Sequence, residues 1–165
     1  MTNRSLCLVT AAAILAAATP AAHATPNTGA GALKDCTTDG DLDRIYSPTA
    51  LRRGLKSMPA DVSGYTDCDD LLRAAFAAGP SIRVHRGRTA LRVRCTRSRY
   101  TAKVSVRGVR IATGTAKPCA RVTRVLRLRV TAFGRSSARK RRAAKVVLNP
   151  GGKQLRFYVR LRVRR

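Results

Sequence analysis

The stretch FYVRLRVR, residues 157–164, decides the fold class of the C-terminal half of the chain. Apolar residues at the odd positions of this stretch alternate with a tyrosine and three arginines at the even positions. Successive side chains of a β-strand point to opposite faces of the sheet, so this alternation predicts a strand with one buried and one arginine-bearing face.

The same alternation recurs upstream. It predicts further strands around residues 82–84, 91–95, 104–106, 109–111 and 126–130, and the apolar run 146–148 leads into the turn Asn149-Pro150-Gly151-Gly152. Six or seven short strands favour a small antiparallel β-sandwich, either immunoglobulin-like or an open barrel. The basic run 136–142 is expected to form an exposed loop or a helical crossover between two of these strands.

The preceding block, residues 34–80, has a helical period instead. Ser47-Pro48 is typical of a helix start, and apolar residues then follow at positions 51, 55 and 58. A second helix is expected to begin near Thr66 or Asp67 and to end at Gly79-Pro80. Its predicted apolar face consists of Leu71, Leu72, Ala75 and Phe76. The sequence therefore predicts an α+β protein in which a short helical hairpin precedes the β-sandwich.

The N-terminus predicts export. Residues 1–24 combine Arg4, an apolar stretch over 6–18 and the cleavage signal Ala22-His23-Ala24, as secretory signal peptides do. The apolar stretch is shorter than the roughly 20 residues that a membrane span needs, and no later segment is long enough to cross a bilayer. We expect cleavage after Ala24, a linker over 25–33, and a mature protein that is secreted or held at the cell surface by its charge.

Four cysteines follow the predicted cleavage site, at positions 36, 68, 95 and 119. An even number of cysteines in an exported chain favours disulfides, and four cysteines allow three pairings. The pairing Cys36–Cys68 and Cys95–Cys119 is favoured because each pair then falls within one compositional block. The Cys36–Cys68 disulfide would join the segment before the helical hairpin to the start of its second helix.

Charge divides the mature chain at Pro80. Residues 25–80 contain all eight aspartates and carry a net charge of −2, whereas residues 81–165 carry +27 without a single acid. We interpret this division as two modules, 34–80 and 81–165. The total charge of +26 excludes an ordinary neutral enzyme and points to acidic partners.

The arginines of the predicted strands are the strongest functional signal. Neighbouring strands lie only about 4.8 Å apart, so arginines on one face repel one another unless an anion neutralises them. A polyanion does so and releases its own counter-ions. The candidate polyanion-binding residues are Arg92, Arg94, Arg127, Arg129, Arg160 and Arg162 on strands and Arg139, Lys140, Arg141 and Arg142 in the basic run. Export favours anionic envelope polymers over nucleic acid as the ligand.

A structural or protein-interaction module is the alternative. In that interpretation the acidic helical hairpin recognises a protein partner, and the basic surface only maintains solubility. Charge reversal of the strand arginines would abolish polymer binding in the first case and leave partner capture intact in the second.

Catalytic and metal-binding chemistry is not predicted. The one histidine after the signal peptide, His85, has no acid near it in sequence, and no nucleophile elbow, phosphate loop or cofactor motif is found. Asp39, Asp41 and Asp43 alternate around Gly40 like part of a calcium loop, but the glycine and the twelfth position do not match an EF-hand. These aspartates are kept as a weak metal candidate only.

The first block also resembles a known group of proteins. The motif DCTTDGDLD at 35–43, Tyr46-Ser47, the stretch 51–55, Pro59-Ala60-Asp61 and the motif YTDC at 65–68 resemble a module of exported proteins of high-GC actinobacteria. The arginine-rich strands are similar to the small sandwich domains that such proteins carry. The resemblance covers residues 34–165 and implies export and two modules. It implies no catalytic activity, since none is established for that group.

Overall fold

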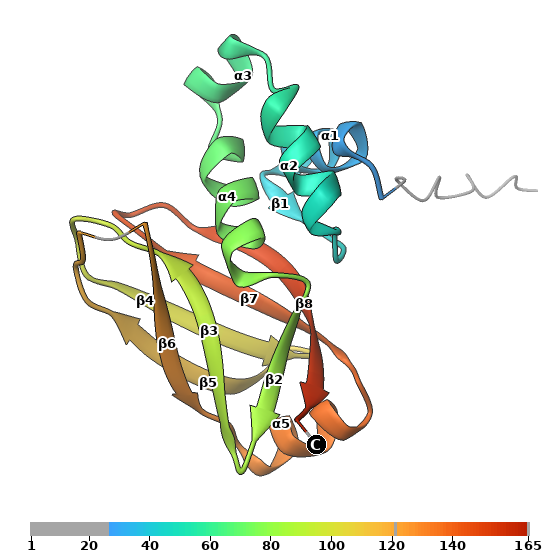
Figure 1. Cartoon of the computed structure of the whole chain (residues 1–165), viewed down its shortest axis with the longest axis vertical. Helices are drawn as coiled ribbons and strands as arrows, with labels where there is room; N and C mark the ends of the chain where they lie inside the picture. The colour runs from blue at the N-terminus through green and yellow to red at the C-terminus, as the bar shows by residue number, and fades with distance from the viewer. Residues whose placement is uncertain (1–26, 121, 165) are drawn as a thin grey trace, which may run out of the picture.

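The computed structural model describes residues 27–120 and 122–164 of the chain. The predicted signal peptide, residues 1–24, lies outside the described residues. Figure 1 shows an α+β arrangement, with helices α1–α4 gathered at one end of a barrel-like sheet and helix α5 at the other. The helical block comprises α1 (Gly29–Asp39), β1 (Asp41–Leu42), α2 (Pro48–Lys56), α3 (Ala60–Tyr65) and α4 (Cys68–Ala78). The remaining elements are β2 (Ser81–His85), β3 (Arg88–Arg94), β4 (Tyr100–Val106), β5 (Val109–Ala116), β6 (Thr123–Arg129), α5 (Ala132–Arg139), β7 (Ala143–Asn149) and β8 (Leu155–Val163).

The predicted strands are all present as β2 to β8, and they form a nearly closed sheet. The order of hydrogen-bonded neighbours is β5-β4-β7-β8-β2-β3-β6, and the two end strands, β5 and β6, lie against each other. A Cβ atom at Gly114 of β5 would lie only 2.2 Å from the side chain of Leu128 of β6, so glycine allows this close approach. Of the two predicted alternatives, the structure therefore has the barrel-like one.

The prediction of a purely antiparallel sheet is wrong. Strands β1 and β2 both pair in parallel with β8, β1 at Arg156–Phe157 and β2 at Arg160–Val163. They therefore lie end to end along one side of β8. Period-two alternation reports which face of a strand is buried, but it contains no information on strand direction, and the long connection from β2 to β8 makes a parallel pairing possible.

The helical block differs from the predicted two-helix hairpin. Helix α2 begins as predicted, with the Ser47 hydroxyl accepting a hydrogen bond from the N–H of Ala50 and Pro48 in the first turn. Helix α4 begins after Asp67 and ends before Gly79, also as predicted. Helices α1 and α3 were not predicted, and α1 starts inside the range expected as a linker. Phe76 is not buried with Leu71 and Leu72, because it lies exposed beneath the guanidinium of Arg52.

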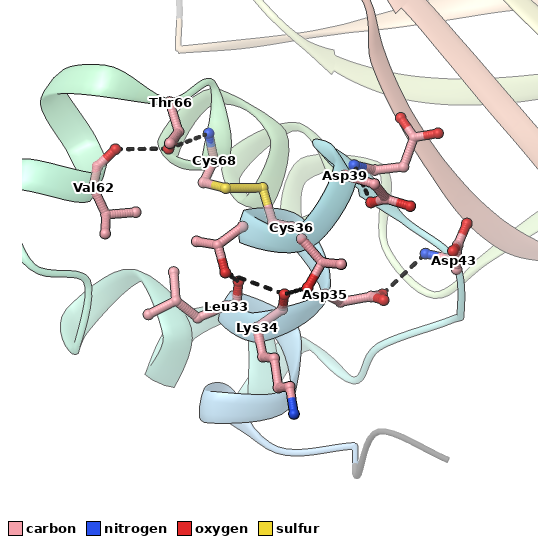
Figure 2. The surroundings of a disulfide bond; sticks show 12 residues. Leu33, Lys34, Asp35, Cys36, Asp39, Asp43, Val62, Thr66 and Cys68 are labelled. Carbon is pink, nitrogen blue, oxygen red and sulfur yellow. Dashed lines mark hydrogen bonds between the residues drawn. A yellow bond between two sulfur atoms is a disulfide. The ribbon is translucent and has the colours of Figure 1, made fainter. Parts of the chain in front are cut away.

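Both predicted disulfides are confirmed in the structure. Cys36 of α1 is bonded to Cys68 at the start of α4, with 5.7 Å between their Cα atoms. Figure 2 shows this bond linking the two helices. Cys95, just after β3, is bonded to Cys119, between β5 and β6, with 5.3 Å between the Cα atoms. The first bond fastens α1 to α4, and the second closes the chain around the β4–β5 hairpin.

One buried core extends through both halves of the molecule. It includes Ala32 and Cys36 of α1, Leu71 and Leu72 of α4, and the inward side chains of the strands. Leu42 of β1 and Phe157 of β8 are neighbours in register and are both about 1% exposed. The helical block therefore contributes a strand and part of the core to the barrel. No helix among the described residues is long and apolar enough to span a membrane.

Replacing Gly29 by alanine should destabilise the protein, although alanine is the better helix former. A Cβ atom at this position would lie 2.7 Å from Cβ of Arg53 and 2.8 Å from the backbone nitrogen of Gly54, where helices α1 and α2 meet. Backbone cannot move out of the way, so we expect a loss of about 1–3 kcal/mol. Urea unfolding of Gly29→Ala measures it.

Gly64→Ala is the matched control. Gly64 lies in α3, and a Cβ atom there would meet nothing within 4 Å. This substitution should be neutral or should raise stability by up to about 1 kcal/mol. Equal effects of the two substitutions would contradict the close contact between α1 and α2.

Candidate anion-binding surface

The strand register brings the exposed arginines together on the outside of β8, β2, β3 and β6. Arg162 of β8 is the register neighbour of Arg83 of β2, and Arg88 of β3 is the neighbour of Arg129 of β6. We call this surface the arginine face and define it as the exposed side chains of Arg83, Arg88, Arg127, Arg129, Arg160, Arg162 and Arg164. Like charges thus lie directly opposite each other on neighbouring strands, which costs stability when no anion is present.

A shallow depression of about 890 Å³ lies on the arginine face. The side chains of Ser81 and Ala90 are small, and they leave room between the longer side chains of Arg83, Arg88 and Arg127. His85 also lines this depression and is surrounded by arginines rather than by an acid.

A second depression, of about 590 Å³, lies where α5 meets the end of β8. It is lined by Arg83, Ala138, Arg139, Arg141, Arg162, Val163 and Arg164, and we call it the α5 cleft. Five of these seven residues are arginines, and no acid is among them. Arg83 and Arg164 line both depressions, so the α5 cleft and the arginine face form one continuous surface.

Backbone hydrogen bonds fix the two walls of the α5 cleft relative to each other. After α5 the N–H of Arg141 donates to the carbonyl of Ala138, at 3.1 Å. The N–H of Leu161 on β8 donates to the carbonyl of Arg142, at 2.9 Å, and the N–H of Arg164 donates to Val84 of β2, at 3.0 Å. Arg139 and Arg141 are thereby held opposite the arginines of β8 and β2.

The aspartates gather at the opposite end of the barrel, around the helices. Asp41 contacts Lys145 and Arg156, at 3.4 and 3.3 Å, and its side chain is only 13% exposed. Asp70 contacts Arg94 and Lys153, both at 3.3 Å. The hydrogen bonds that Lys153 donates to the carboxylates of Asp67 and Asp70 raise the pKa of Lys153. Within residues 27–120 and 122–164, no salt bridge includes an arginine of the arginine face or the α5 cleft.

The ten predicted binding residues divide into four groups. Arg127, Arg129, Arg160 and Arg162 lie on the arginine face, and Arg139 and Arg141 line the α5 cleft. Arg92 and Arg94 lie on the same outward side of β3 as Arg88, but they line a separate groove beside Phe76, and Arg94 is paired with Asp70. Lys140 and Arg142 lie next to the α5 cleft in sequence but do not line it.

Three arginines of this surface were missed by the sequence prediction. Arg83, Arg88 and Arg164 all lie on the arginine face, and Arg83 and Arg164 also line the α5 cleft. The signal was present, because Arg83 lies between Ile82 and Val84 and Arg164 continues the alternation of β8. Only the register of β2 beside β8 shows that these residues meet.

The weak metal candidate is not supported by the geometry. The carboxylate of Asp39 accepts a hydrogen bond from the backbone N–H of Asp41. The carboxylate of Asp41 forms salt bridges with the side chains of Lys145 and Arg156. Figure 2 shows the N–H of Asp43 donating to the carboxylate of Asp35. Across the described part of the chain, no three His, Cys, Asp or Glu side chains come together as a metal site.

No protein-family model matches the chain, and no curated protein matches it in sequence. A function is therefore argued from the arginine face and the α5 cleft.

Proposed function

We propose that this protein is an exported, non-enzymatic protein that binds anionic polymers of the cell envelope or the extracellular space through the arginine face. The observation that carries the proposal is the α5 cleft. Five arginines from β2, from the end of β8 and from the end of α5 line this depression, and no carboxylate is among its lining residues. A protein that needed these arginines only for solubility could distribute them over its surface and avoid their mutual repulsion.

The physical gain comes from the polymer's counter-ions. A linear polyanion carries a condensed layer of cations, and a protein that neutralises its charges releases them into solution. The register pairs Arg83–Arg162 and Arg88–Arg129 supply closely spaced positive charge for this purpose. The guanidinium group adds directed hydrogen bonds, because it binds phosphate and carboxylate groups with two parallel N–H donors.

Export would place this surface outside the cell. The signal-peptide pattern of residues 1–24 and the two disulfides fit an oxidising compartment. In that compartment the polymers with phosphate or carboxylate groups belong to the envelope, so we favour them over chromosomal DNA. The same charge would retain the secreted protein at the cell surface.

A protein-interaction role of the helical block is the second candidate. It is favoured by Tyr65 of α3, whose exposed fraction is 91%, since an exposed aromatic residue is a common anchor in interfaces. The pairing of Asp41, Asp67 and Asp70 with cations of β7 and of the turn between β7 and β8 weighs against it, because fewer acids are left to attract a basic partner.

A binding panel with a salt titration tests the proposal. The oxidised protein without residues 1–24 is titrated into polyphosphate, poly(dT), polyglutamate and dextran sulfate, with a disordered arginine-rich peptide of equal charge as the control. We expect the folded protein to bind at least one polymer more tightly than the peptide at about 0.15 M salt. Equal binding of protein and peptide on every polymer would overturn the proposal and direct attention to the helical block.

A further inference from the structure

We propose that the α5 cleft is a discrete site for a phosphate group, and that Arg141 is kept there for binding at a cost to the fold. This inference rests on the proposed function and deepens it. It distinguishes one built site from the rest of the arginine face, which would attract polymer by its charge alone.

The number and placement of the arginines indicate the class of ligand. A carboxylate offers two oxygens in one plane, and one or two guanidinium groups satisfy them. The α5 cleft presents Arg139 and Arg141 from one wall and Arg83, Arg162 and Arg164 from the other. A phosphate monoester carries nearly two negative charges and three terminal oxygens that point in different directions, so it can accept hydrogen bonds from both walls at once. The cleft volume of about 590 Å³ leaves room for the unit to which the phosphate is attached.

The backbone of Arg141 marks a lining position of the α5 cleft at which arginine is an unusual residue. Its φ angle is 49°, in the left-handed region that side chains other than Asn, Asp and Gly rarely adopt. Among the described residues, the non-glycine residues with positive φ are Arg86, Arg107 and Arg141, and all three are arginines. Arg141 lines the α5 cleft and Arg86 lines the depression on the arginine face, whereas Arg107 lines neither. Arg86 and Arg107 each precede a glycine of positive φ in a two-residue hairpin turn that requires this conformation, whereas Arg141 follows a helix, where glycine or asparagine is the usual residue, and its side chain lines the α5 cleft.

The position of Arg141 explains why the chain accepts this conformation. Helix α5 ends at Arg139, and the chain must then turn towards β7 and run beside β8. The N–H of Arg142 donates to the carbonyl of Ser137, and the carbonyl of Arg142 accepts the N–H of Leu161. These bonds fix the backbone on both sides of the turn, so they fix the point from which the side chain of Arg141 extends along the α5 cleft.

Arg141→Asn and Arg107→Asn form a matched pair of test variants. Each removes one charge, and each gives a positive-φ position the residue that tolerates it better. We expect both variants to unfold at a temperature about 2 °C higher or more. Binding of inorganic tripolyphosphate at about 0.15 M salt, measured by calorimetry, should weaken about tenfold in Arg141→Asn and less than twofold in Arg107→Asn. Citrate, a compact tricarboxylate, should bind wild-type protein at least fivefold more weakly than tripolyphosphate.

Two further arms distinguish the source of the phosphate group. Vesicles of phosphatidylcholine with phosphatidic acid present the group on a lipid, and polyphosphate presents it on a polymer. Stronger dependence on Arg141 with one carrier than with the other identifies that carrier as the better fit.

Equal losses of tripolyphosphate binding in the two variants would overturn the inference, because the cleft would then act only through its charge. Equal affinity for citrate and tripolyphosphate would overturn the assignment of phosphate. Either result leaves the proposed function in place if the folded protein still binds a polymer more tightly than the control peptide.

Discussion

Substituting Arg83, Arg127, Arg162 and Arg164 together by glutamine should weaken binding to poly(dT) about 100-fold to 1,000-fold at 0.15 M salt. These four residues span the arginine face, and Arg83, Arg162 and Arg164 also line the α5 cleft. Each lost phosphate contact lowers the slope of log K against log salt by about 0.7, so the slope should fall by about 3. Fluorescence anisotropy of labelled poly(dT) at several salt concentrations gives both quantities.

The matched control removes four arginines that lie elsewhere. Arg97, Arg99, Arg107 and Arg110 are exposed, and none of them belongs to the arginine face or the α5 cleft. This variant has the same net charge as the first, and we expect less than a tenfold loss of affinity. The face variant should also be at least as stable as wild type, because fewer like charges then lie in register. Equal losses in both variants would show that only net charge matters.

Helices and strands were predictable from the sequence to different degrees. The strands were found because period-two alternation is strong wherever one face is buried, as in Phe157, Val159 and Leu161. Helix α1 was missed because its buried face consists of small residues, such as Gly29 and Ala32, which resemble a linker in composition. Its contact with α2 depends on a close approach of backbones that apolar periodicity does not report. Strand order and direction depend on contacts between distant segments, and the alternation contains no sign of them.

The candidate site was predictable in its chemistry but not in its arrangement. A block rich in arginine and without acids indicated an anionic partner, and most of the predicted arginines are indeed exposed on the outer surface of the barrel. The pairing of Arg94 with Asp70 could not be read from sequence, because it joins residues 24 apart through the packing of α4 on β3. The α5 cleft likewise exists only because the end of α5, β2 and β8 meet at one point.

Leu42→Ala should destabilise the whole molecule by about 3 kcal/mol, not the helical block alone. Leu42 is 1% exposed and lies beside Phe157, the register neighbour through which β1 joins the sheet. Truncating it leaves a cavity between the helical block and the barrel. Because one core extends through both, we expect a single unfolding transition in urea at a lower midpoint. Circular dichroism follows that transition, and amide exchange in β4 and β7 reports on barrel strands outside the helical block.

Val62→Ala is the control for this prediction. Val62 lies on α3, is only partly buried and packs against the outer side of the core, so its truncation should cost less than about 1.5 kcal/mol. The charge division at Pro80 predicts two modules, and if the barrel module folded without the helices, Leu42→Ala would release the helices while the amides of β4 and β7 stayed protected. Under the shared core they lose protection together with the helices, because the free energy that holds β8 in place includes its pairing with β1. The amide-exchange pattern of the barrel therefore decides between two hypotheses. The charge pattern predicts that the helical block and the barrel unfold separately, and the packing predicts that they share one core and unfold together.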